Sequence, residues 1–129
     1  MKSSLLLIAC LFGWNALWAQ SDISPAVSAA LKKGDASALA THFMAEVELT
    51  LGGKDGLVEK AKAQQMLAGF FTENPPQVFN IKHQGTSKLD DQFRIGELIT
   101  SKGTFRVTFF MKKNNNVLQI KQFKIEPAS

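Results

Sequence analysis

His83 and Glu97 are the two side chains in this sequence best suited to chemistry. His83 follows the alternating apolar residues Phe79 and Ile81, and Glu97 lies between two isoleucines of the next alternating segment. A histidine beside a carboxylate can pass a proton or polarise a bound ligand. Because an unpaired carboxylate is unfavourable in an apolar interior, we expect Glu97 to have a partner or to lie at a hydrated rim. The alternative is that both residues lie near strand ends in structural roles.

The remaining residue inventory argues against most catalytic mechanisms. The sequence has no tyrosine, and its single cysteine, Cys10, lies in the N-terminal apolar segment. The rest of the chain therefore offers no thiol nucleophile, thiolate metal site or disulfide. His42 is the only other histidine, and its spacing from His83 and Glu97 does not indicate a three-ligand metal site. We predict no catalytic residue set, no metal and no cofactor, and keep a hydrolase or isomerase using His83 and Glu97 as a less favoured alternative.

Residues 1–19 are typical of a secretory signal peptide. Lys2 supplies the positive start, the segment from Leu5 to Trp18 is almost wholly apolar, and Ala19 places a small residue before the polar run that follows. The apolar run is short for a bilayer-spanning helix, which needs about 20 residues, and no later segment approaches that length. We predict export to the periplasm or the extracellular space, with no mature transmembrane anchor and a single domain in residues 20–129.

One alternative concerns Cys10. The run Leu7-Ile8-Ala9-Cys10 resembles a lipobox, in which the cysteine is acylated and becomes the new N-terminus. The apolar segment before it is shorter than the roughly 7–15 residues of an ordinary signal peptide, and a second apolar run continues beyond it. Acylation would tether the domain to a membrane through lipid chains rather than through a helix.

The charge balance argues against nucleic acid as a partner. Lysine and arginine total 15 against 11 acidic residues, a formal net charge of +4, and the basic residues are spread along the chain. The basic pairs Lys32-Lys33 and Lys112-Lys113 are far apart in the sequence. Nucleic-acid-binding domains usually concentrate their positive charge in one stripe or patch.

The N-terminal part of the domain is predicted to be helical and then to form a strand. Ser24-Pro25 combines an N-cap residue with a proline at the first helical position, and Gly34 ends that helix. Asp35 caps a second, short helix. Residues 46–51 alternate between apolar and polar and predict a half-buried strand, and residues 52–56 predict a flexible turn.

The third helix has the clearest signal. From about residue 60 to residue 73, apolar side chains that include Met66 and Phe70 recur at helical spacing. Pro75 and Pro76 then stop the helix, because proline restricts its predecessor and cannot continue it. A stripe of methionine and phenylalanine is typical of a helix that packs on a core.

The chain after Pro76 predicts an antiparallel four-stranded meander. Alternation places Phe93, Glu97 and Phe109 on the face that packs against the third helix. It places Leu98, Arg106 and Phe110 on the outer face of the sheet. In the last strand the apolar positions change parity between residues 120 and 123, so we predict a bulge near Lys121-Gln122.

This order of elements resembles the nuclear transport factor 2-like superfamily, also described as cystatin-like. Four segments are similar to a domain-of-unknown-function family of exported bacterial proteins with that fold: Ala30-Leu31-Lys32-Lys33-Gly34-Asp35, His83-Gln84-Gly85, Ile95-Gly96-Glu97-Leu98 and Phe105-Arg106-Val107. The resemblance implies an α+β cone, with N-terminal helices packed in the concave face of a curved antiparallel sheet. It implies no activity. Several enzymes of this fold use tyrosine hydroxyls beside an acidic residue, and this chain has no tyrosine.

The preferred interpretation is a non-catalytic binding module. An apolar cone with few polar groups is the usual composition of a ligand pocket. We expect it to hold a small apolar or amphipathic ligand, or a peptide, between the third helix and the sheet. The residues predicted to line the pocket are His83, Glu97, Met66, Phe70, Phe93 and Phe109.

The second interpretation is a homodimeric interaction or assembly protein that uses the outer sheet face. Leu98 and Phe110 would supply an apolar centre, and Arg106 belongs to a cationic rim. Such a surface suits sheet-to-sheet association between two copies.

Overall fold

The computed structural model describes residues 22–128, so the expected signal peptide and Cys10 lie outside the described residues. The elements in chain order are α2 (Ser24–Lys33), α3 (Ala36–Ala40), β1 (Phe43–Leu51), β2 (Lys54–Glu59), α4 (Lys60–Glu73), β3 (Pro76–Thr86), β4 (Gln92–Thr100), β5 (Gly103–Asn114) and β6 (Val117–Pro127). Within these residues, no helix has the length and apolar character needed to cross a membrane.

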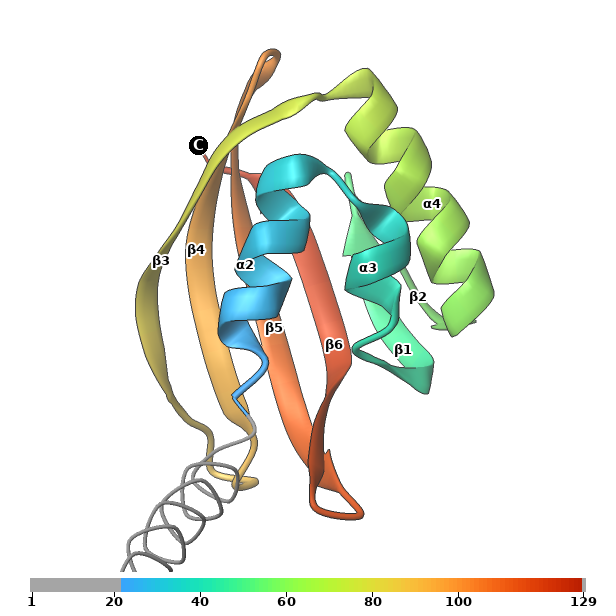
Figure 1. Cartoon of the computed structure of the whole chain (residues 1–129), viewed down its shortest axis with the longest axis vertical. Helices are drawn as coiled ribbons and strands as arrows, with labels where there is room; N and C mark the ends of the chain where they lie inside the picture. Colours follow the sequence, from blue (N-terminus) through green and yellow to red (C-terminus); the bar gives the residue numbers. More distant parts are fainter. Residues whose placement is uncertain (1–21, 129) are drawn as a thin grey trace, which may run out of the picture.

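The strands form one curved six-stranded sheet with the helices on its concave side (Figure 1). The strand order is β2-β1-β6-β5-β4-β3, and every neighbouring pair is antiparallel except β1 and β6, which are parallel. Helix α2 packs against β3, and α4 packs against β1 and β2. This arrangement confirms the α+β fold class predicted from the sequence.

The helix ends follow the predicted signals with one shift. Gly34 adopts a left-handed conformation (φ 69°) after α2, and the Asp35 carboxylate accepts a hydrogen bond from the Ala38 N–H at 3.0 Å. Ser24 is the first residue of α2 rather than its cap. The Asp22 carboxylate accepts a hydrogen bond from the Ser24 N–H at 2.9 Å, and so takes part of the capping role.

Strand β2 was not predicted, because its residues do not alternate between apolar and polar in the sequence. Five of its six residues are exposed, as expected of an edge strand. Gly52 and Gly53 both have positive φ (58° and 88°), which allows a tight hairpin turn between β1 and β2. The segment expected to be a turn is therefore a two-residue turn followed directly by a strand.

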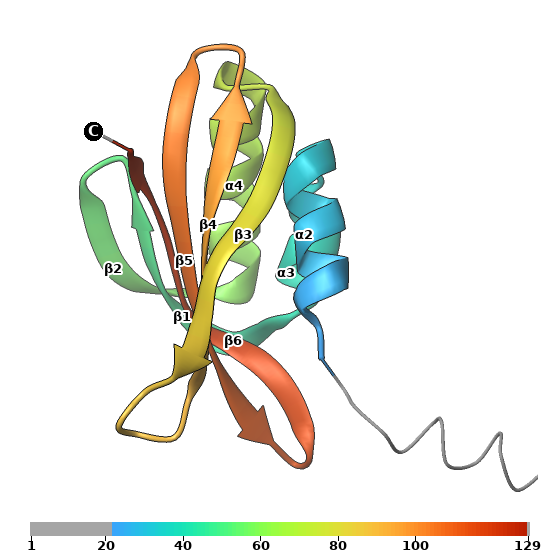
Figure 2. The same ribbon diagram turned by 90° about the vertical axis from the view of Figure 1, so that its left-hand side faces the viewer.

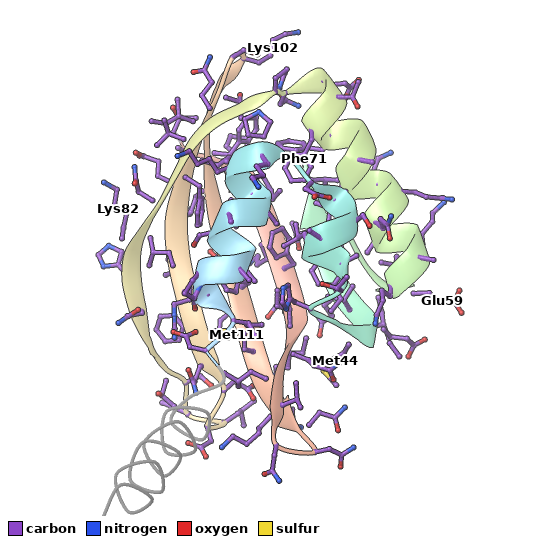
Figure 3. All side chains as sticks on the ribbon, in the orientation of Figure 1. Met44, Glu59, Phe71, Lys82, Lys102 and Met111 are labelled. Atoms are coloured by element: carbon purple, nitrogen blue, oxygen red, sulfur yellow. The ribbon has the colours of Figure 1, made fainter. Side chains whose placement is uncertain are left out.

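Aromatic rings fill the space between the sheet and the helices. The centroid of the Phe123 ring lies 5.6 Å from that of Phe43 and 6.1 Å from that of Phe109. The helices contribute fully buried leucines, including Leu31, Leu39 and Leu67. Figure 3 shows Phe71 pointing inward from α4, whereas Lys82 projects from β3 away from the helices. The interior of the cone is thus a packed core.

The predicted facing of β4 was wrong. The buried side chains of this strand belong to Arg94, Leu98 and Thr100, whereas Phe93 and Glu97 lie on the outer face. Leu98 is 0% exposed, so it belongs to the core and not to the outer surface on which it was predicted.

Packing from other elements explains why β4 faces this way. A Cβ atom added to Gly96 would lie 2.5 Å from Cζ of Phe79, so the absence of a side chain makes room for that ring. The Thr100 hydroxyl donates a hydrogen bond to the Gly103 carbonyl at 2.8 Å. The Arg94 guanidinium lies 3.6 Å from the Asp22 carboxylate. Each inward position that looks polar or empty in the sequence therefore has a contact in the fold, although the Arg94 Nε atom is buried without a hydrogen-bond partner.

The predicted bulge in β6 is confirmed. The pairing with β5 shifts between Phe110 and Met111 and leaves Lys121 without a partner residue. The shift keeps the apolar residues on both sides of the bulge buried. A second bulge, which was not predicted, interrupts β3 between Ile81 and His83.

We predict that Gly96→Ala destabilises the domain by about 1–3 kcal/mol, because the new methyl group would overlap the Phe79 ring. Gly69→Ala is the matched control. Gly69 lies in α4, where an added Cβ atom would meet open space, so alanine there should be neutral or stabilising by up to about 1 kcal/mol. Urea denaturation measures both, and equal stability of Gly96→Ala and wild type would contradict the proposed packing.

Candidate functional site

The six residues predicted to line a pocket lie in separate places. Phe109 is fully buried in the core, and Met66 and Phe70 are partly buried on α4. His83 and Glu97 lie together on the outer face of the sheet. Phe93 also lies on that face but does not line the same depression. The expected arrangement around an open cone is therefore wrong, because core side chains occupy the cone.

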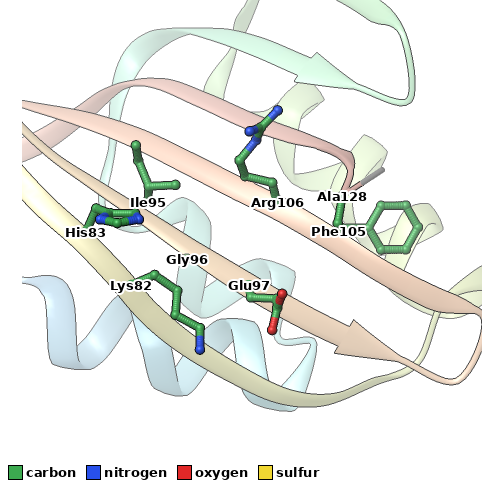
Figure 4. A pocket seen from close by; sticks show the side chains of 8 residues that line it. All are labelled: Lys82, His83, Ile95, Gly96, Glu97, Phe105, Arg106 and Ala128. Atoms are coloured by element: carbon green, nitrogen blue, oxygen red, sulfur yellow. The ribbon is translucent and has the colours of Figure 1, made fainter.

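A shallow depression of about 280 Å³ lies on the outer face of β3, β4 and β5 (Figure 4). We call it the outer depression. Its lining residues are Lys82, His83, Ile95, Gly96, Glu97, Phe105, Arg106 and Ala128. Only His83 and Glu97 of this set were predicted as pocket residues.

The bulge in β3 builds one side of the outer depression. Ile81 pairs with Gly96 and His83 pairs with Ile95, so Lys82 is the extra residue between them. A bulge places an additional side chain where the regular alternation would not. Lys82 and His83, although adjacent in the chain, therefore both line the outer depression.

The other side of the outer depression comes from the pairing of β4 with β5. Glu97 lies directly opposite Arg106 in the register. Lys82, His83 and Arg106 are exposed, and Glu97 is half-buried. Within residues 22–128, no ion pair joins the Arg106 guanidinium to the Glu97 carboxylate, so both groups remain available to a third partner.

The chemistry of the outer depression suits binding better than catalysis. Two permanent cations and an imidazole surround a surface that contains Ile95 and Phe105. A carboxylate can contact the cations while an adjoining apolar group covers the isoleucine. Proton transfer between His83 and Glu97 would take place in contact with water, without the burial that tunes catalytic groups.

The predicted interface residues divide between the surface and the core. Arg106 and Phe110 lie on the outer face as expected, whereas Leu98 is buried. The rings of Phe93 and Phe110 pack against each other with centroids 5.7 Å apart. Gly85 lies beneath this pair, since a Cβ atom there would be 2.8 Å from Cζ of Phe93. The outer face therefore carries a partly exposed aromatic pair.

Met66 and Phe70 line a different feature. They belong to a groove of about 360 Å³ between α4 and the β1–β2 turn, which Leu51 and Lys54 also line. The Phe70 ring packs edge-on against Phe105, with centroids 5.0 Å apart. We call this the α4 groove, and it is separate from the outer depression.

A buried polar cluster on the concave face was missed by sequence reasoning. Arg94 is 8% exposed, donates a hydrogen bond to the Phe93 carbonyl at 3.0 Å and lies beside Asp22. Burial opposes ionisation of the Asp22 carboxyl group, but the Ser24 N–H and the Arg94 guanidinium outweigh it and hold the pKa of Asp22 below its usual value. An arginine in an alternating strand usually marks the exposed face, so only the distant Asp22 explains this position.

His42 does not join the residues of the outer depression. It lies in the turn before β1, where burial lowers its pKa. The part of the chain that the structure describes contains no cluster of three or more histidine, cysteine, aspartate or glutamate side chains arranged to hold a metal ion.

Comparisons with known proteins identify a family without an assigned activity. The family described as "Domain of unknown function (DUF4783)" matches residues 24–126. A protein of this family from Bacteroides fragilis YCH46 is 33% identical with a TM-score of 0.77, and the match covers 83% of this chain and 100% of the relative. Another from Bacteroides ovatus ATCC 8483 is 34% identical with a TM-score of 0.78, covering 85% and 99%. A comparison with curated proteins finds no match.

A more distant neighbour shares the fold alone. A domain of unknown function with a cystatin-like fold from Nostoc punctiforme is 9% identical with a TM-score of 0.66, covering 83% of this chain and 74% of that one. Together with a protein whose name marks it as nuclear transport factor 2-like, this similarity confirms the fold that the sequence resembles.

We predict that the Asp22 carboxylate stabilises the domain at neutral pH and that this contribution disappears in acid. A carboxyl group whose pKa is lowered by folding adds stability above its unfolded pKa of about 3.9, which is lost as the pH falls through the lower folded value. Urea denaturation of wild type and Asp22→Asn should therefore differ at pH 6 and converge near pH 2. Asp55→Asn, at an exposed carboxylate on β2, is the control. A difference that persists unchanged at pH 2 would contradict the prediction.

Proposed function

Because the chain belongs to the DUF4783 family, whose description assigns no activity, we propose its function from the geometry of its outer face: it is a non-catalytic binding module. Its ligand is a small amphipathic molecule, or a peptide, that carries an acidic group. The ligand binds in the outer depression rather than inside the cone.

The observation that carries this proposal is the convergence of Lys82, His83 and Arg106 around the apolar side chain of Ile95. The β3 bulge brings the first two residues to this place, and the β4–β5 register brings the third. Among the residues that the structure describes, neither Lys82 nor Arg106 forms an ion pair, so both cations can contact an external anion. The apolar surface between them adds affinity for a ligand that has both a charged and an apolar part.

Glu97 gives the outer depression a preference among acidic ligands. Its half-buried carboxylate lies opposite Arg106 in the register and repels a second negative charge in the same space. A ligand with one acidic group beside an apolar chain therefore fits better than a compact polyanion. This reasoning supports a monocarboxylate or a peptide with a single acidic residue.

We predict that octanoate, used as a probe, perturbs the backbone NMR signals of Lys82, His83 and Gly96 in a protein spanning residues 22–129. Solved relatives whose chains are matched over 99–100% of their length contain little beyond this domain, which supports its independent folding. Arg106→Gln should weaken octanoate binding about tenfold, because it removes a charge-assisted hydrogen bond.

The controls separate the charge from the apolar contact. Lys102→Gln, at the exposed β4–β5 turn, should leave octanoate binding unchanged. Octanol has the same chain length without the carboxylate and should bind more weakly than octanoate. Perturbations confined to Met66 and Phe70 would instead assign the ligand to the α4 groove, and would contradict the proposal.

A specific observation favours self-association as a second candidate function. Glu126, Arg106 and Glu97 lie opposite one another across β6, β5 and β4, so their charges alternate along one row of the outer face. A two-fold axis brings the same surface of two copies together, so Arg106 of one copy can meet a glutamate of the other. The Phe93–Phe110 pair would supply the apolar centre of such a homodimer.

We predict that, if self-association is the function, wild-type protein sediments as a dimer at high micromolar concentration and Phe110→Asp sediments as a monomer. The introduced charge would be buried without a partner in the interface. Leu57→Asp changes an exposed leucine on β2 and is the control. A wild-type protein that remains monomeric throughout this range would exclude the homodimer.

A further inference from the structure

The two hairpin tips at one end of the sheet carry exposed aliphatic side chains. Leu89, in the β3–β4 turn, is 78% exposed, and Val117, after the β5–β6 turn, is 53% exposed. The hairpin end, as we call residues 86–91 and 112–118, is remote from the β4–β5 turn that carries Lys102 (Figures 1, 2 and 3).

The fold does not require a leucine at position 89. The turn is shaped by the Ser87 hydroxyl, which accepts hydrogen bonds from the N–H groups of Leu89 and Asp91, and by the positive φ of Asp90 (68°). The Leu89 side chain takes no part in these contacts. A single exposed leucine is common on protein surfaces, so the significance of Leu89 depends on the other exposed apolar and charged side chains at the same end.

One ion pair connects the two hairpins that carry these tips. The Lys121 ammonium forms an ion pair with the carboxylate of Asp91, which joins the β3–β4 turn to β6. A cleft of about 230 Å³ between the tips is lined by residues of both, including Thr86 and Lys113. Leu89 and Val117 therefore lie on two separate tips at the same end of the sheet, and an ion pair joins the two hairpins near their base.

Positive charge surrounds these aliphatic side chains. Lys88 precedes Leu89, and Lys112 and Lys113 precede the β5–β6 turn; all three lysines are exposed. Asp91 is already paired with Lys121, which leaves Asp90 as the exposed acidic residue of the β3–β4 turn. Aliphatic side chains flanked by lysines match the interface of an anionic bilayer, where apolar groups enter the headgroup region and cations meet the lipid charges.

The start of the described chain supports the same partner. Helix α2 begins on the side of the domain nearer the hairpin end and runs away from it (Figures 1 and 2). The residues before Asp22 include Cys10, for which acylation is the alternative expectation. Such acylation would tether the chain to a membrane from this end, whereas a cleaved signal peptide would leave no tether.

We propose that the hairpin end is a membrane-docking surface, at which Leu89 and Val117 insert into the headgroup region of an anionic phospholipid bilayer while the neighbouring lysines contact its lipids. The surface shares no residue with the outer depression. Docking and ligand binding can therefore be tested separately, and the failure of one does not imply the failure of the other.

The tryptophan content of the sequence allows a direct test of insertion. Both tryptophans, Trp14 and Trp18, precede the domain, and the chain has no tyrosine, so a protein spanning residues 22–129 has no intrinsic fluorophore of either type. Leu89→Trp should show a blue-shifted emission on addition of vesicles of phosphatidylglycerol and phosphatidylcholine, and none with phosphatidylcholine alone. Leu57→Trp, at another exposed leucine, should show no shift with either.

Sedimentation with vesicles, using protein without an introduced tryptophan, measures how much each side chain of the hairpin end contributes to membrane binding. Leu89→Ser should lower the partition coefficient about tenfold through lost apolar contact. Lys88→Gln and Lys113→Gln should each lower it roughly fivefold, and 0.5 M salt should lower it further. Lys102→Gln should have no effect, and thermal melting checks that each variant remains folded.

Two results would overturn the proposal. The first is a wild-type protein that does not sediment with phosphatidylglycerol vesicles at low salt, which would leave an acidic protein surface as the alternative partner of the lysines. The second is an equal loss of binding in Lys88→Gln and Lys102→Gln, which would show that net charge rather than the hairpin end determines binding.

Discussion

The packing of the Phe79 ring into the space above Gly96 determines which face of the central sheet meets the helices. A methyl group at position 96 would come within 2.5 Å of that ring and 2.7 Å of the Asn80 carbonyl, so the contact exists only because this residue is glycine. With Gly96 facing inward, Leu98 two residues later also faces the core. The intervening Glu97 is thereby fixed on the outer face. The contact thus determines the position of Glu97, one of the residues that line the outer depression.

The two bulges extend that constraint to the neighbouring strands. In β6, Lys121 is the extra residue of the bulge, so the apolar residues before and after it both face the core. Lys121 forms an ion pair with Asp91, which joins β6 to the β3–β4 turn. In β3, the bulge before His83 turns a regular edge strand into one wall of the outer depression. Both bulges thus combine a packing role with the placement of a charged side chain.

Local sequence signals predicted the positions of most elements correctly, but they predicted the wrong set of inward-facing side chains in β4. Helix α4 occurs where the apolar stripe and the two prolines place it, and Gly34 ends α2, because these signals act within one or two turns of chain. Strand β4 is different. Its outward side carries Phe93 and Ile95, whereas its inward side includes Arg94 and Gly96, so hydrophobicity alone indicates the wrong face.

Contacts with residues distant in the sequence determine which side chains of β4 face the core, against the hydrophobic pattern of the strand. Asp22 neutralises Arg94 from before the first described helix, and Phe79 fills the space at Gly96 from the adjacent strand. Neither partner is visible in the alternation of β4 itself. The same limit affected the candidate site: His83 and Glu97 were expected on a concave face that other side chains occupy, and both line the outer depression instead. Residue type identified the pair, and only the packing of distant residues located it.

The arrangement of the two proposed binding surfaces makes them compatible in one molecule. Strand β3 continues for three residues beyond His83 to Thr86, which corresponds to roughly 10 Å at the usual rise of a strand, before the turn that carries Leu89. Side chains that dock in a bilayer interface enter it by about 5–10 Å. In a domain docked on the bilayer through its hairpin end, the outer depression would therefore lie above the headgroups and remain open to water. The strand that positions Lys82 and His83 would then act as a rigid spacer, because its pairing with β4 and its packing against α2 fix its direction relative to the docking end.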